Sequence, residues 1–138
     1  WDDAKYPLLL AVVRDAAEYD QLFHPAPVIG KKRPFAPPAE QWDQEQLVVV
    51  ARVVPATPKP EQVLEVEQLT AEGRTLTVKY RFRAPSAAKA TSREKNSLQL
   101  RIPREEYDRV VFIENGKPAG ELHLAKDEWA RPEPARQE

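Results

Sequence analysis

Few side chains in this chain could form a catalytic centre. The sequence has no cysteine, which excludes a thiol nucleophile and the usual cysteine ligands of zinc. The two histidines, His24 and His123, are about a hundred residues apart, and no serine stands in a Gly-x-Ser-x-Gly turn. The sequence therefore predicts no metal, no cofactor and no enzyme activity. A hydrolase that lacks a recognisable motif is the third-ranked hypothesis.

One charge pattern could serve binding. The chain has 21 Lys and Arg against 22 Asp and Glu, yet residues 74–104 carry nine basic side chains and a single acid, Glu94. Residues 61–72 carry only acids, so part of the basic excess pairs across a predicted hairpin, where surface ion pairs add little stability. The remaining bases, Lys89, Arg93 and Lys95, fall in a predicted loop at residues 84–95, and a second predicted loop at residues 24–41 contains Lys31, Lys32 and Arg33.

If those loops meet at one end of a sheet, they form a site for a polyanion such as an acidic glycan. Nucleic acid is not expected, because no aromatic residue alternates with the loop bases to stack on a base. A tryptophan beside a strand is either a ligand platform or a core anchor, and we favour the core anchor. The candidate binding residues are Lys31, Lys32, Arg33, Trp42, Lys89, Arg93 and Lys95.

Alternating apolar and charged residues indicate the sheet that would position these loops. Residues 64–67 and 76–82 both alternate, and Gly73 between them suits the left-handed position of a three-residue loop. A hairpin is therefore predicted. Its expected cross-strand pairs are Val66 with Val78, Leu64 with Tyr80, and Glu65 with Lys79.

Continuous apolar runs predict three strands that are buried on both faces, at residues 7–13, 46–54 and 110–113. Asn115-Gly116 is a strong signal for a two-residue hairpin turn. Because Pro118 has no backbone N–H, the following strand, residues 117–124, is expected at a sheet edge. Residues 96–102 alternate and predict another, half-buried strand.

A short helix is predicted at about residues 16–24, with Asp15 as its N-cap and Glu18 as the capping-box partner. The next segment, residues 24–41, is a proline-rich loop. A connection of this length is usually functional or disordered.

These elements predict an α+β, mainly β domain over residues 1–127. It is expected to be a small antiparallel β-sandwich or open barrel of about six to seven strands with one short N-terminal helix. Residues 128–138 form a charged, proline-bearing tail that is expected to fray. No apolar run approaches the length of a membrane span.

The order of elements resembles a poorly characterised family of bacterial exported domains, similar to the C-terminal domain of the protease-complex subunit PrcB. The segments that carry this resemblance are Arg14–Phe23, Gln46–Val53, the Leu64–Phe82 hairpin ending at Ala84-Pro85, and Val110–Ile113. Lys59–Val63 stands where the family tends to have a Gly-Gly-Tyr-like stretch, so no role of that turn transfers.

The resemblance implies a non-catalytic module that supports or contacts another protein in the envelope or outside the cell. An exported protein whose signal sequence was removed is therefore expected. The leading hypothesis is a protein-interaction module that uses the edge strand 117–124, by addition of a partner strand, or the proline loop 24–41. A small-ligand or polyanion-binding module is the alternative.

Overall fold

The computed structural model describes residues 6–23, 40–86 and 92–133. These residues are mainly β and form eight strands in two four-stranded sheets, more than the six to seven strands expected. The first sheet is antiparallel throughout and has the order β5-β2-β1-β8. Its strands are β1 (Leu8–Val13), β2 (Glu45–Pro55), β5 (Arg93–Pro103) and β8 (Ala130–Glu133).

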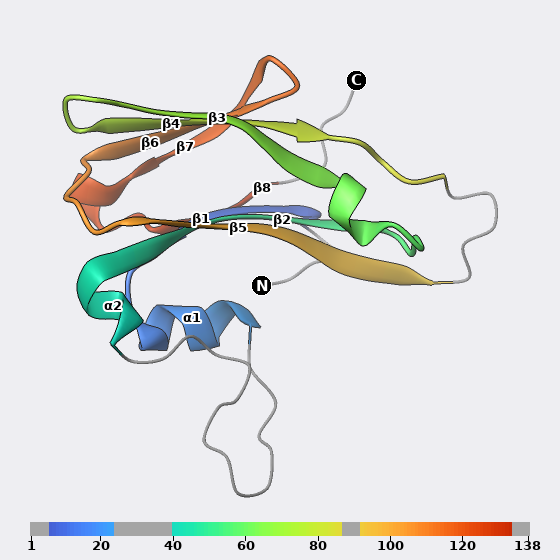
Figure 1. Ribbon diagram of the computed structural model, residues 1–138, viewed down its shortest axis with the longest axis horizontal. Helices are drawn as coiled ribbons and strands as arrows, with labels where there is room; N and C mark the ends of the chain where they lie inside the picture. Colours follow the sequence, from blue (N-terminus) through green and yellow to red (C-terminus); the bar gives the residue numbers. More distant parts are fainter. Residues whose placement is uncertain (1–5, 24–39, 87–91, 134–138) are drawn as a thin grey trace, which may run out of the picture.

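The second sheet has the order β3-β4-β6-β7 and is mixed. β4 and β6 pair in parallel, which the antiparallel prediction did not include. The parallel pair arises because the chain leaves this sheet after β4, adds β5 to the first sheet, and then returns with β6 (Figure 1). The strands of the second sheet are β3 (Leu64–Glu72), β4 (Thr75–Phe82), β6 (Arg109–Glu114) and β7 (Lys117–His123).

The two sheets stack, and two helices cover the outer face of the first sheet (Figure 1). These helices are α1 (Ala16–Phe23) and the single turn α2 (Gln41–Gln44), so the described residues hold a second short helix beyond the one predicted. Two 3₁₀ turns, η1 (Pro60–Gln62) and η2 (Leu124–Lys126), complete the described elements. No helix among these residues has the length and apolar character needed to cross a membrane.

The first sheet lies between the second sheet and the helices, so its central strands are buried on both faces. Leu8, Leu10 and Val12 of β1 face the second sheet, whereas Leu9 and the alternate residues after it face the helices. Burial of all six β1 residues confirms the prediction for the run at 7–13, and most of β2 is likewise buried. Trp42 of α2 lies in the core under the helices, as the core-anchor interpretation predicted.

β6 does not have two buried faces. Val110 and Phe112 are fully buried, but Val111 and Ile113 are half-buried. The outer face of the second sheet has no described helix over it, unlike that of the first sheet (Figure 1). The prediction for residues 110–113 was therefore wrong for one face.

The two hairpins differ in how well they were predicted. Asn115 (φ 52°) and Gly116 (φ 78°) form the two-residue turn between β6 and β7, as expected. The β3–β4 turn has two residues, Gly73 and Arg74, rather than three, and Val66 pairs with Tyr80 rather than with Val78. A bulge at Glu67 shifts the register between Val66 and Gln68.

The C-terminal segment also differs from its prediction. Ala130–Glu133 forms β8 and pairs antiparallel with β1, so this part of the expected frayed tail is ordered in the sheet. Trp129, which precedes it, packs on the core under the helices, and its carbonyl accepts a bond from Val12 N (2.8 Å). These contacts explain why the chain does not leave the domain at residue 128.

Candidate functional site

A polar pocket of about 530 Å³ lies where the end of β1, the β3–β4 turn, η2 and the connection between β5 and β6 meet. Its charged lining contains three arginines and three acids. They are Arg14, Arg74, Arg104, Glu105, Glu106 and Asp108.

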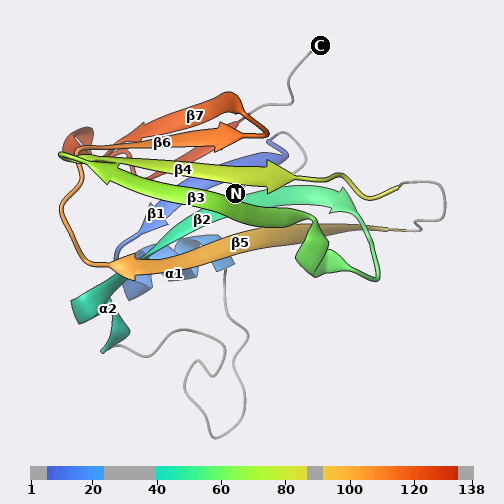
Figure 2. The ribbon, with the colours of Figure 1, turned by 45° about the horizontal axis from the view of Figure 1, so that its top comes forward.

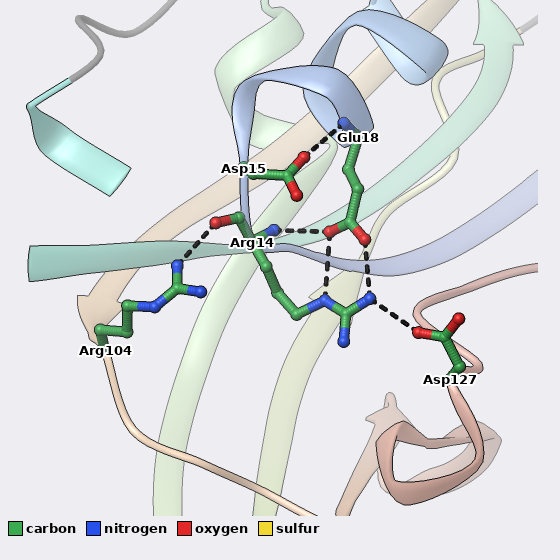
Figure 3. Close-up of polar contacts among 5 residues, drawn as sticks. All are labelled: Arg14, Asp15, Glu18, Arg104 and Asp127. Atoms are coloured by element: carbon green, nitrogen blue, oxygen red, sulfur yellow. Dashed lines mark hydrogen bonds and ion pairs between the residues drawn. The ribbon is translucent and has the colours of Figure 1, made fainter. Parts of the chain in front are cut away.

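Arg14 is fixed by the start of α1 (Figure 3). Asp15 Oδ1 accepts the Glu18 N–H at 2.8 Å, which confirms Asp15 as the N-cap. Glu18 accepts the backbone N–H of Arg14 (2.8 Å), not that of Asp15, and also binds the Arg14 guanidinium (2.7 Å). The predicted capping box is thus displaced by one residue. The hydrogen bonds that the Arg14 guanidinium donates to Glu18, and to the nearby Asp127, raise the pKa of Arg14.

The other two pocket arginines are also engaged. Arg104 Nη1 donates to the carbonyls of Arg14 (2.6 Å) and Trp42 (3.0 Å), and so fastens the end of β1 to α2. Arg74 Nε donates to Asp108 at 2.8 Å, which raises the pKa of Arg74. Three positive and three negative groups line the pocket, so it offers no excess charge to a polyanion.

A second polar cluster joins the two sheets. Glu114 on β6 accepts from the guanidinium of Arg52 on β2 and from the Tyr80 hydroxyl (2.8 Å). The Arg52 and Glu114 side chains are only 20% and 14% exposed, and the guanidinium lies 4.0 Å from the centre of the Phe82 ring. Each group has a partner, so this arrangement stabilises the sandwich rather than presenting a reactive group.

The histidine that the structure describes stands on the outer face of the second sheet. His123 Nε2 lies 3.0 Å from Glu121 Oε1, and Arg109 Nε donates to Glu121 (2.9 Å). The bond from Arg109 lowers the pKa of Glu121. Within the described ranges, no group of three or more His, Asp or Glu side chains could hold a metal ion.

Of the basic residues predicted from the sequence, the structure describes Arg93 and Lys95, and both lie in β5 rather than in a loop. Lys31, Lys32, Arg33 and Lys89 lie outside the described residues. Arg93 and Lys95 pair with the far end of β2, about 30 Å along the strand from its start next to Trp42. Arg93 Nη2 donates to the Val53 carbonyl (3.3 Å).

β7 lies at an edge of the second sheet, as Pro118 predicted, but parts of this edge are covered. Arg131 Nη1 of β8 reaches the Glu121 carbonyl (3.4 Å). At Gly120 the strand comes so close to the first sheet that an added Cβ would lie 2.8 Å from Leu10 Cδ1. The missing N–H of Pro118 and the contacts that cover parts of β7 both oppose the addition of a partner strand. The proline loop, the other predicted partner site, lies outside the described residues except for Glu40 and Gln41.

β3, at the opposite edge, is more open. It starts beside β5, where Asn96 Nδ2 donates to the Pro60 carbonyl (2.8 Å), and the two strands diverge along their length (Figures 1 and 2). Leu64 is accordingly buried, whereas Val66 and Leu69 are 42% and 40% exposed. Among the described residues these are the only large hydrophobic side chains in the exposed class.

Some backbone N–H and C=O groups of β3 also point toward this edge, away from β4. Arg83 N donates to the Val63 carbonyl (2.8 Å), so those residues form a hydrogen-bonded pair. Because hydrogen-bonded and non-hydrogen-bonded pairs alternate, Leu64 and Val66 point their N–H and C=O groups away from β4. The pair Glu72–Thr75 closes the turn. Counted from this pair, the same alternation means that Leu69 and Ala71 also point their N–H and C=O groups away from β4. The candidate site is therefore the β3 edge, defined here as residues 64–72.

The sequence pointed to the β7 edge, whereas β3 is the more open edge of this sheet in the structure. A proline identifies an edge strand, but the same proline blocks part of it. The available signal for β3 was the spacing of three between Val66 and Leu69, which interrupts the period of two and marks the bulge. No family model, no curated protein and no solved structure matched this chain.

Proposed function

We propose that this domain is a non-catalytic protein-interaction module that binds an extended segment of a partner along the β3 edge. The observation that carries this proposal is the exposure of Val66 and Leu69 on a nine-residue edge strand. Their cross-strand partners Tyr80 and Val78 are fully buried, so both side chains face the interior side of the sheet.

An added strand would extend this sheet in two ways. Its backbone would pair with the N–H and C=O groups that β3 directs away from β4. Its alternate side chains would cover Val66 and Leu69 and lie above the half-buried Leu98 and Leu100 of β5. Backbone pairing would then supply affinity, and the apolar row would supply register. An exported setting, implied by the resemblance noted above, belongs to this proposal.

Amide hydrogen exchange with a defined peptide tests the docking site. The probe is a synthetic peptide that copies Asn96–Ile102, a segment with apolar residues at alternate positions, and carries Arg101→Gln. Slower exchange is expected for the amides of Leu64, Val66 and Leu69, and not for those of β7. No slowing on β3, or slowing on β7 alone, would contradict the proposal.

A pair of double variants provides the matched control. Val66→Thr with Leu69→Thr introduces a residue that also favours strands but has less apolar area. The Kd for the peptide should therefore rise about tenfold. Val111→Thr with Ile113→Thr makes the same chemical change on the outer face of β6 and should leave that Kd unchanged. Equal effects from the two pairs would count against a site on β3.

A further inference from the structure

The charges along β3 indicate what kind of segment it accepts. β3 has three acidic residues, Glu65, Glu67 and Glu72, and no basic residue. Glu65 pairs with Arg81 on β4. For Glu67 and Glu72 the structure gives no ion pair within the ranges it describes. The β3 edge therefore combines an apolar row on its inner side with three acids, of which only Glu65 has an ion pair among the described residues.

The basic residues closest in the pairing lie one strand away from the edge, although Lys79 and Arg81 line the same hollow as Glu67. Lys79 and Arg81 lie on β4, which is the neighbour of β3 on the side away from the edge. A strand added at the edge would meet Glu67 and Glu72 directly. Opposite charges on adjacent strands stabilise pairing, and like charges oppose it.

We infer that the β3 edge selects an extended partner segment in which apolar side chains alternate with lysine or arginine. This inference rests on the proposed function, because it specifies the partner of that same edge. The acids would serve two purposes. They attract a basic strand, and they disfavour antiparallel pairing of β3 with β3 of a second copy, which would bring acids together.

Three peptides test the charge preference on the unmodified protein. Each copies Asn96–Ile102, and the positions of Ser97, Gln99 and Arg101 are all lysine, all glutamine or all glutamate. The basic peptide should bind about fivefold more tightly than the neutral one, and the acidic peptide more weakly. In about 1 M NaCl the three Kd values should converge, because exposed charges are then screened.

Charge reversal on the protein gives the reciprocal test. Glu67→Lys with Glu72→Lys should invert the order, so that the acidic peptide binds most tightly. Glu40→Lys with Asp43→Lys makes the same change in net charge at exposed positions on and beside α2, on the other side of the first sheet, and should preserve the original order. Thermal midpoints within a few degrees of the parent would show that both variants remain folded.

The possible results separate this inference from the proposed function. Equal binding of the basic and neutral peptides on β3 would overturn the charge preference and leave the docking edge intact. No peptide protection on β3 would remove both. Sedimentation velocity that shows a dimer, abolished by Val66→Thr with Leu69→Thr, would identify a second copy as the occupant and overturn the inference of a basic partner.

Discussion

At the scale of single residues, the most consequential polar group is Glu114, because two other groups depend on it. Glu114→Ala would remove the acid that binds Arg52, which is 20% exposed, and the hydrogen bond that the Tyr80 hydroxyl donates to Glu114. Loss of one partner of a mostly buried pair is costly, since the remaining charge stays desolvated. We expect the free energy of unfolding in urea to fall by about 2 to 3 kcal/mol.

The exposed Arg101–Glu45 pair is the control for that experiment. It also joins two strands, with a guanidinium–carboxylate distance of 2.7 Å, but Arg101 and Glu45 are 61% and 29% exposed. Arg101→Ala should therefore leave the urea midpoint unchanged within error. If Glu114→Ala behaved in the same way, the cluster between the sheets would have no special role in stability.

Glu121 provides a pH-dependent prediction at the same scale. The hydrogen bond from Arg109 lowers the pKa of Glu121, so this carboxylate favours the folded state above its ordinary pKa. The contribution is lost as the pH falls through the lowered folded-state pKa. An NMR titration should give a midpoint for Glu121 below the ordinary glutamate range, and Arg109→Gln should move it upward. An unchanged midpoint in Arg109→Gln would refute the assignment of Arg109 as the main cause.

At the scale of elements, the direction of each β3 amide can be tested with proline. Ala71 directs its N–H toward the unpaired edge, whereas Thr70 pairs with Thr77 in the hydrogen-bonded set. Ala71→Pro should therefore change the thermal midpoint little and block strand addition. Thr70→Pro removes a ladder bond and should destabilise the fold by about 3 kcal/mol. The reverse order of midpoints would show that the register is shifted by one residue.

The elements also show which features the sequence could specify. Runs such as Leu8–Val13 predicted buried strands, and Asn115-Gly116 predicted a turn, because each depends on local chemistry. The β3–β4 register was mispredicted because the turn consists of Gly73 and Arg74 and not of three residues ending at Gly73, and the bulge at Glu67 then shifts the pairing again. Only the tertiary structure shows that both Val66 and Leu69 lie on the inner face. The parallel β4–β6 pair was missed for the same reason, since it depends on where β5 goes.

The sequence pattern favoured the edge strand at residues 117–124 as a candidate site, and the structure adds β3 as a more open edge. An edge strand for a partner was expected, and its position on β3 depends on how β3 and β5 diverge, which no local pattern encodes (Figure 2). The basic residues that the sequence brought forward were chosen by charge alone. Arg93 and Lys95 lie far from Trp42 because they pair with one end of the eleven-residue strand β2, whereas Trp42 lies next to its other end.

At the scale of the whole molecule, the sandwich is closed on the β7 side and open on the β3 side. Gly120 marks the closed side, because a Cβ there would lie 2.8 Å from Leu10 Cδ1 and 3.0 Å from Glu133 Oε1. Leu10 is fully buried, so its side chain has little room to move. Gly120→Ala should therefore force the two sheets apart locally and cost about 1 to 3 kcal/mol of unfolding free energy.

A double-mutant cycle distinguishes this close contact from a general effect of alanine in a strand. Leu10→Val shortens the side chain whose Cδ1 methyl group lies opposite Gly120, and alone should cost about 1 kcal/mol. Combined with Gly120→Ala, it should cost clearly less than the sum of the two single changes, because the shortened side chain admits the new methyl group. Additive costs would mean that the sheets do not meet at Gly120. The asymmetry between a closed edge and an open edge would then lose its structural basis, and with it the argument that a partner strand prefers β3 over β7.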